Sequence, residues 1–237
     1  LKPFWLKPFS SKHFFKSFAM TDFRAVLNST IRPGMHADPM GSAEAGDLQH
    51  LLMGITSHVF EGFLNFIGAF AREDSVVPQW YLKSFSDVQL DDLSIYLTGY
   101  EICEKFRAWL LENGHSALSV AEVLFAAGCP GVVARAQFFL SHCQAELSSH
   151  TLSAMIDARN VLGLDCNNMT YFVDYFCIRQ CLNGDFKPHA VETVIETLGH
   201  TILLLGPVRN PWALTRAWCV FEIATTIRTS ANFTSIP

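Results

Sequence analysis

A single acidic side chain stands within an apolar stretch near the end of the printed chain. Glu222 lies in the run WCVFEI at residues 218–223, and every other residue in 217–224 is apolar. This pattern predicts a largely buried helix, in which a carboxylate is costly unless it is paired or takes part in binding or catalysis. Arg216 and Arg228 are the partners that a purely structural role would use. Glu222 is therefore the first candidate for a functional group.

The residues before Glu222 predict strands that alternate with helices. Continuous apolar strands such as 202–205 are typical of a sheet that is covered on both faces. Strands separated by helical segments of this length indicate βαβ units and a parallel sheet. The expected strands are 137–141, 170–176 and 201–205, and the expected helices are 146–162, 187–198 and the segment that contains 218–223.

A different pattern precedes this alternation. Apolar residues recur every three or four positions from Leu48 to Phe70, which predicts one amphipathic helix. The sequences TGYE at 98–101 and SVAE at 119–122 fit the capping box, in which two polar side chains satisfy free N–H groups at a helix start. We accordingly divide the chain into a poorly ordered N-terminal extension at 1–45, a helical region at 46–130 and a partial α/β domain at 131–237.

The N-terminal extension is rich in Lys and Phe. Residues 1–21 contain Lys2, Lys7, Lys12 and Lys16 and no acidic residue, a composition that fits a membrane-surface or transit-like segment. The repeated Lys-Pro-Phe and the presence of Met20, where translation could begin, favour instead a fragment or an over-extended reading frame.

The composition limits the classes of partner. The chain has 237 residues, of which 50% are hydrophobic and 16% charged, as expected for one or two globular cores. A formal net charge of -5 argues against a nucleic-acid-binding surface. No apolar run reaches the length of about 18 uncharged residues that a membrane-spanning helix requires. Seven scattered cysteines, an odd number, indicate a reducing compartment and hence a cytoplasmic protein without a disulfide framework.

Two cysteines have a spacing that metal sites also use. Cys177 and Cys181 are four positions apart and could bind a metal together with His142 or His200. No second pair of Cys or His has ligand spacing, so two small buried thiols are the favoured interpretation. We expect no metal.

The α/β domain resembles the Toll/interleukin receptor (TIR) family, in particular its first three βα units. The run WCVFEI matches the plant-type helix start Trp-Cys-Leu-x-Glu-Leu, and ALTRAWCVFE at 213–222 is similar to TIR-like modules of algal and protist proteins. The resemblance implies a flavodoxin-like sheet with strand order 2-1-3-4-5. Because the chain stops at Pro237, we expect the last two strands to be missing and 201–205 to be an exposed edge. The family's first three strands correspond to FFLSH at 138–142, YFVD at 171–174 and ILLL at 202–205.

The resemblance also implies a chemistry for Glu222. The matching glutamate of many family members is catalytic: it binds the nicotinamide-side ribose of NAD and supports cleavage to nicotinamide and ADP-ribose. A carboxylate suits this step because cleavage develops oxocarbenium charge on the ribose. NAD is then the substrate, and no separate cofactor is expected. The residues expected to line the site are Trp218, one turn before Glu222, and Asp174, Ser141 and His142 at the strand ends.

Several of these assignments have simpler alternatives. Asp174 could cap the adjacent loop, and His142 could be a strand-end hydrogen-bonding group instead of a base. Arg216 fits a surface charge as well as an anion clamp. The protein as a whole could be a non-catalytic signalling scaffold that self-associates or binds other TIR-like domains, or a fragment with no activity of its own.

Overall fold

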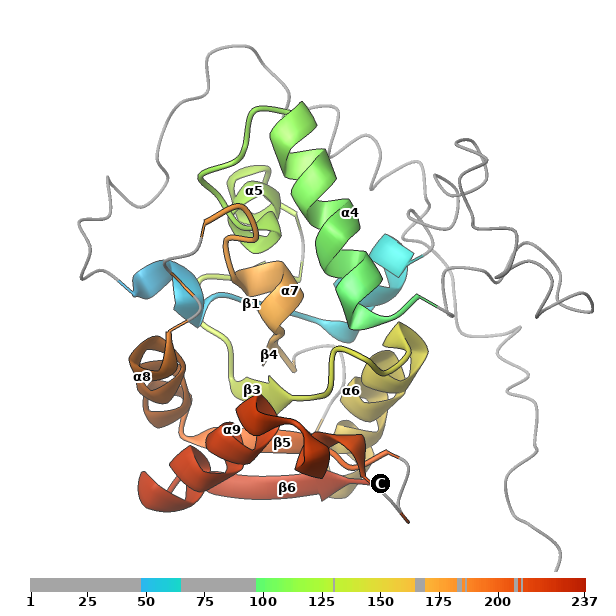
Figure 1. Ribbon diagram of the computed structural model, residues 1–237, viewed down its shortest axis with the longest axis vertical. Helices are drawn as coiled ribbons and strands as arrows, with labels where there is room; N and C mark the ends of the chain where they lie inside the picture. Colours follow the sequence, from blue (N-terminus) through green and yellow to red (C-terminus); the bar gives the residue numbers. More distant parts are fainter. Residues whose placement is uncertain are drawn as a thin grey trace, which may run out of the picture.

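A mixed six-stranded sheet forms the centre of the molecule, with helices packed around it (Figure 1). The computed structural model describes residues 48–64, 97–129, 131–164, 169–182, 185, 187–206, 209 and 211–237, so the N-terminal extension expected at 1–45 lies outside the described residues. The strand order is β2-β1-β4-β3-β5-β6. The strands are β1 (Gly54–Ile55), β2 (Val132–Val133), β3 (Phe138–Ser141), β4 (Tyr171–Phe172), β5 (His200–Leu204) and β6 (Asn232–Ile236).

The helices begin where the local signals predict. Both capping boxes form: Thr98 accepts from the Glu101 N–H and Ser119 from the Glu122 N–H, and each glutamate accepts from the N–H of its cap residue. Among the described residues, no helix combines the length and the apolar composition that crossing a membrane requires. The named helices are η1 (Gln49–Leu52), α4 (Gly99–Glu112), α5 (Val120–Ala126), α6 (Ser148–Leu162), α7 (Asp174–Cys177), α8 (Pro188–Leu198), η4 (Trp212–Thr215) and α9 (Ala217–Arg228).

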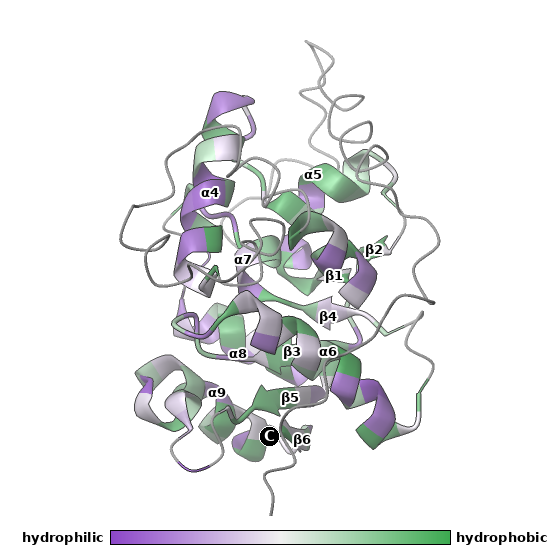
Figure 2. Ribbon diagram, turned by 90° about the vertical axis from the view of Figure 1, so that its right-hand side faces the viewer, coloured by the Kyte–Doolittle hydropathy of each residue, from purple (hydrophilic) through white to green (hydrophobic). Residues whose placement is uncertain are grey.

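Four neighbouring strands, β4-β3-β5-β6, run parallel, and their order matches the first four positions of the expected 2-1-3-4-5 arrangement. Crossovers between parallel strands are right-handed, so the change of direction after β4 places α6 on one face and α8 with α9 on the other. Figure 1 shows α8 and α9 side by side, away from α6. Figure 2 shows hydrophobic strands between these helices, as expected for a sheet covered on both faces.

The end of the chain differs from the expectation. Asn232–Ile236 forms β6, which pairs with β5 from His200↔Asn232 to Leu204↔Ile236. The prediction that the chain stops before the fourth strand is therefore wrong, and β5 is not an edge. The sequence NFTSI hides this strand because only its last residue is buried, whereas β3 and β4 are buried throughout and β5 is buried except at His200.

The helical region also contributes to the sheet. The helix expected from Leu48 to Phe70 is replaced by η1, then by β1, and then by a helical stretch at 57–64, while 65–70 lie outside the described residues. β1 pairs antiparallel with β4 on one side and with β2 on the other. Pairing with distant strands thus outweighs the helical spacing of the apolar residues in this segment.

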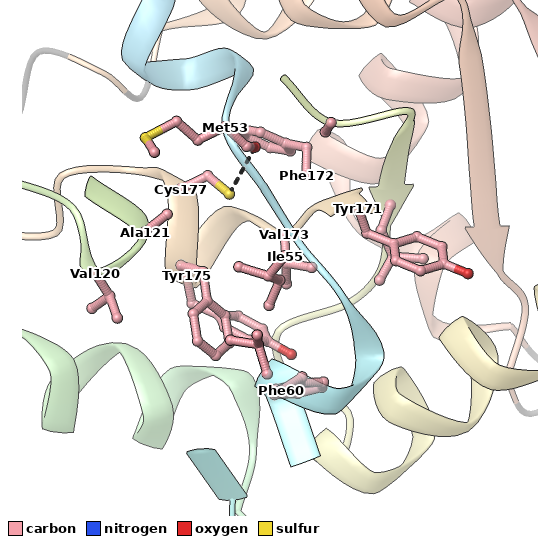
Figure 3. Close-up of a cluster of buried hydrophobic side chains, with 14 of the residues drawn as sticks. Met53, Ile55, Phe60, Val120, Ala121, Tyr171, Phe172, Val173, Tyr175 and Cys177 are labelled. Carbon is pink, nitrogen blue, oxygen red and sulfur yellow. Dashed lines mark hydrogen bonds between the residues drawn. The ribbon is translucent and has the colours of Figure 1, made fainter. Parts of the chain in front are cut away.

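The segment 48–64, called the N-terminal segment from here on, shares one hydrophobic core with the α/β domain. Met53, Ile55 and Phe60 lie against the residues around β4 and α7, and the Cys177 thiol donates to the Met53 carbonyl at 3.2 Å (Figure 3). An aromatic contact continues this core, because the rings of Phe60 and Phe176 meet edge to face with centroids 5.5 Å apart. The elements on both sides of residue 130 therefore pack as neighbours.

The backbone at Gly54 in β1 lies so close to Ala136 that no side chain fits between them. A Cβ atom placed there would lie 2.6 Å from the Ala136 Cβ and 2.8 Å from the Ala136 Cα. We expect Gly54→Ala to lower the free energy of unfolding by about 1 to 3 kcal/mol, since backbone must move to relieve the overlap. Urea denaturation measures the effect. Gly206→Ala is the matched control, because a Cβ there meets no atom within 4 Å; an equal loss in both variants would contradict the steric explanation.

Candidate active site

The carboxyl ends of β3 and β4 bring three of the five expected site residues to α9, the helix that carries the other two. Ser141 is the last residue of β3, His142 follows it, and Asp174 opens α7 two positions after β4. Glu222 lies in α9, which follows β5 and packs on the same sheet. Parallel strands present their carboxyl ends at one edge, where open α/β sheets bind ligands.

Glu222 is held by a hydrogen bond across the sheet edge. The Ser141 hydroxyl donates to Glu222 Oε2 at 2.5 Å, and Ser141 itself has 0% of its surface exposed. The following turn of α9 is tied to β5, because the Thr226 hydroxyl donates to the Glu222 carbonyl oxygen at 2.8 Å and lies 2.8 Å from the Thr201 hydroxyl. The half-buried carboxyl group is therefore positioned by both the sheet and its own helix.

The surroundings of Glu222 favour its neutral form. Burial raises the pKa of Glu222 to about 8; the nearby Asp174 charge acts in the same direction, while the Ser141 hydrogen bond and His142 oppose the shift. The group is thus poised to change its protonation state close to neutral pH, which is where general acid-base and electrostatic catalysis by carboxyl groups operates.

A second pair, His142 and Asp174, lies beside the first. His142 Nε2 is 3.0 Å from Asp174 Oδ1, which also accepts from the Tyr175 N–H at 2.6 Å, while Gln144 donates to Oδ2 at 2.5 Å. Burial opposes ionisation of both partners, but their mutual attraction holds the pKa of Asp174 below and the pKa of His142 above the ordinary value. The mutual attraction therefore favours the ionised forms of both groups. Asp174 is the first residue of α7, and its carboxylate contacts both the helix backbone at Tyr175 and the side chains of His142 and Gln144.

Sequence reasoning missed two residues of the loop after β3. Gln144 was not assigned, yet it supplies a direct hydrogen bond to Asp174. Glu146 is 2% exposed, and neither carboxylate oxygen has a hydrogen-bond partner among the described residues. Burial raises the pKa of Glu146 to about 7, against the attraction of His142. A polar amide and an acid directly after a buried strand were the signals available in the sequence.

Trp218 and the two arginines take other partners. The half-buried Trp218 ring packs edge to face on Phe221, with centroids 5.8 Å apart, at the border of the core. Arg228 forms an ion pair with Glu192 at 2.5 Å, and Arg216 donates to the Tyr100 hydroxyl. The alternative in which Arg216 or Arg228 neutralises Glu222 is therefore wrong.

Cys177 and Cys181, whose spacing metal sites also use, have separate surroundings. The Cys181 thiol lies 3.8 Å from the Arg107 carbonyl, and His200 lies 2.9 Å from the Thr234 hydroxyl, so neither is directed to Cys177. Across the described part of the chain, no group of three or more His, Cys, Asp or Glu side chains is arranged to hold a metal ion.

The protonation of Glu222 predicts a pH dependence of stability. Between its ordinary pKa of 4.5 and about 8, the folded protein keeps a proton that the unfolded chain has released, so the free energy of unfolding falls as pH rises. Glu222→Gln removes this loss, and we expect the variant to gain roughly 2 to 4 kcal/mol over the parent between acidic and alkaline pH. Urea denaturation of both proteins across this range measures the difference, in which the contribution of Glu146 cancels. Parallel curves would show that Glu222 is ionised in the folded state throughout.

Comparisons with known proteins add no relative to this description. No protein-family model, curated protein or solved structure matches the chain significantly. The α/β architecture with a mixed six-stranded sheet is the part of the expected TIR likeness that the structure supports.

Proposed function

We propose that this chain is a TIR-like enzyme that hydrolyses the N-glycosidic bond of NAD to nicotinamide and ADP-ribose, with Glu222 as the catalytic carboxylate. The observation that carries the proposal is the hydrogen bond between Ser141 and Glu222 at the carboxyl edge of the parallel strands. This bond holds a carboxyl group of raised pKa at the carboxyl ends of the strands. Open α/β sheets bind ligands at that edge, and carboxyl groups of shifted pKa are common in active sites.

The proposed step breaks the bond between the ribose C1′ and the ring nitrogen of nicotinamide. The bonding electrons leave with nicotinamide, which becomes neutral, and positive charge develops on the ribose. The ionised Glu222 stabilises that charge and accepts the proton that the attacking water loses as it adds to C1′. Ser141 positions the carboxylate, and the His142–Asp174 pair supplies a fixed dipole beside it.

Purified protein incubated with NAD tests the proposal. Nicotinamide release is measured by chromatography near pH 7 and near pH 9, with the protein free and clustered on a support. We expect release to rise with pH through about 8, because the carboxylate form of Glu222 is the active one. Absence of nicotinamide under all four conditions would contradict the proposed hydrolysis of NAD.

A non-catalytic scaffold that self-associates or binds other TIR-like domains is the second candidate. Large apolar side chains are exposed on α9, η4 and β6, among them Ile227 at 71%. We expect Ile227→Glu to weaken self-association, measured by sedimentation, without lowering stability, because the side chain is mostly in solvent. Unchanged sedimentation would leave Ile227 without a role in assembly. The other exposed side chains of this group are Trp212, Leu214, Val220 and Phe233.

A further inference from the structure

Two buried side chains of the loop after β3 have polar atoms without a hydrogen-bond partner. Glu146 is 2% exposed, and among the described residues neither of its carboxylate oxygens meets a donor. His142 is 7% exposed; its Nε2 lies 3.0 Å from Asp174, while its Nδ1 has no partner in the described part of the chain. A buried polar group without a partner costs free energy, so a ligand that completes both groups would recover that energy on binding.

The backbone of Glu146 is held from both sides. Its N–H donates to the Cys143 carbonyl at 2.8 Å, and its carbonyl accepts from the Gly99 N–H at 3.3 Å. Two positions further, the Ser148 N–H donates to the Leu97 carbonyl at 2.7 Å. The loop after β3 is therefore held against the start of α4, and the Glu146 side chain enters the interior from a backbone that is already in place.

Glu146 and Glu222 act on the same two neighbours. Burial lowers the pKa of His142, whereas Asp174 raises it, and the charges of both glutamates add to that rise. Burial is the main cause of the raised pKa of the Cys219 thiol, and both glutamates add to it as well. The Cys219 thiol donates to the His142 carbonyl at 3.3 Å, three positions before Glu222 in α9. The unpartnered atoms therefore adjoin the candidate catalytic carboxyl group, at an edge where Asp174 and Glu222 are partly exposed.

The two unpartnered groups need a ligand atom that both donates and accepts. A carboxylate only accepts, whereas Nδ1 of an ionised histidine only donates. One hydroxyl group can accept from Nδ1 and donate to Glu146, and a neighbouring hydroxyl of a cis-diol can donate to the second carboxylate oxygen. A carboxamide also donates and accepts, but its two N–H bonds diverge and reach only one of these oxygens. A cis-diol such as that of ribose therefore fits the pair best.

We propose that Glu146 and Nδ1 of His142 bind the hydroxyl groups of the ribose whose C1′ lies at Glu222. This inference rests on the proposed function, because it names the part of NAD that these two side chains receive. Glu146 is then a binding residue that selects a ribose with both hydroxyls, and Glu222 acts on the glycosidic bond of the same sugar.

Calorimetry with ADP-ribose and ADP tests the inference, because ADP lacks the second ribose. Near pH 8 most of the Glu146 carboxyl group is ionised, since burial raises its pKa only to about 7 against the attraction of His142. Glu146→Gln removes the charge and one acceptor, and it is expected to weaken ADP-ribose binding about 10-fold and to leave ADP binding unchanged. Glu146→Ala removes both acceptors and should lose at least as much affinity. Glu112→Gln, at the exposed end of α4, is the matched control.

Urea denaturation of each variant separates a lost contact from a lost fold. We expect Glu146→Gln to be at least as stable as the parent near pH 8, because it removes a buried carboxyl group of raised pKa. Unchanged ADP-ribose binding in a folded variant, equal weakening for both ligands, or no ADP-ribose binding to the parent overturns the inference. If ADP-ribose binds through Glu146 but NAD is not cleaved, the proposed function fails and this inference holds. Cleavage of NAD together with unchanged ADP-ribose binding in Glu146→Gln gives the opposite result.

Discussion

Glu222→Gln is expected to lower the rate of nicotinamide release from NAD at least about 100-fold. The amide keeps the size of the side chain and can still accept from the Ser141 hydroxyl, which lies 2.5 Å from Glu222 Oε2. It cannot carry the negative charge that stabilises an oxocarbenium ion or accept the proton of water. Initial rates measured by chromatography near pH 9, where the parent carboxyl group is ionised, give the largest difference.

Stability separates this loss from a loss of fold. The neutral amide removes a carboxyl group whose pKa is raised to about 8 by burial, so the variant is expected to be at least as stable as the parent at alkaline pH. Glu192→Gln, on the outer face of α8, makes the same chemical change at a surface ion pair and should leave the rate unchanged. A Glu222→Gln protein that keeps a substantial share of the parent rate would exclude Glu222 as the catalytic carboxylate.

Arg179→Met is expected to lower the free energy of unfolding by about 3 to 5 kcal/mol. Arg179 donates from Nε and Nη2 to the two oxygens of Glu122 at 3.0 and 2.6 Å, and the Glu122 side chain is 0% exposed. Glu122 also accepts from the Ser119 N–H at 2.6 Å, so it cannot leave the interior without losing the α5 cap. Removing the arginine leaves the buried Glu122 carboxylate without its positively charged partner. Urea denaturation near neutral pH measures the loss.

The double variant Glu122→Gln/Arg179→Met tests the cause. Glutamine keeps a capping side chain at this position and carries no charge, so much of the lost stability should return. If the single and double variants unfold at the same urea concentration, the stranded charge is not the source of the effect. Arg228→Met breaks the exposed pair with Glu192 and is expected to have no measurable effect on unfolding.

The pair also explains why the lead-in helices and the sheet form one core. Glu122 lies in α5, and Arg179 follows α7, whose side chains pack on the N-terminal segment (Figure 3). Asp185, further along the same loop, accepts from the Arg179 N–H at 3.2 Å and lies 2.9 Å from His50 Nε2. These contacts therefore tie this loop, which follows the boundary expected at residue 130, to two elements that precede it.

Most elements followed from signals within a few consecutive residues. The alternation of apolar strands and helices predicted β3, β4, β5 and the helices between them, although β4 ends earlier because α7 begins at Asp174. The capping boxes formed as predicted, since their two side chains are only three positions apart. Such local features form as the sequence predicts because their geometry depends only on the neighbouring backbone.

Strands β1 and β6 depended on pairing with distant segments. Ile55 stands in a stretch with helical spacing, yet it pairs with Tyr171 and with Val132. β6 exposes most of its side chains and is recognised as a strand only through its ladder with β5. Neither strand has a continuous apolar pattern of its own, so no local rule identified them.

For the candidate site, the sequence by itself determined that Glu222 is an acid in an apolar helix and that Ser141, His142 and Asp174 lie at strand ends. Only the tertiary structure decided the partners. Glu222 meets Ser141, which is 81 positions away, and Arg216 turns to Tyr100, which is 116 positions away. Hydrogen bonds and pKa shifts depend on the distances and burial that arise when remote segments pack together. The pattern of residue types therefore specifies which groups are available, and the packing specifies which of them interact.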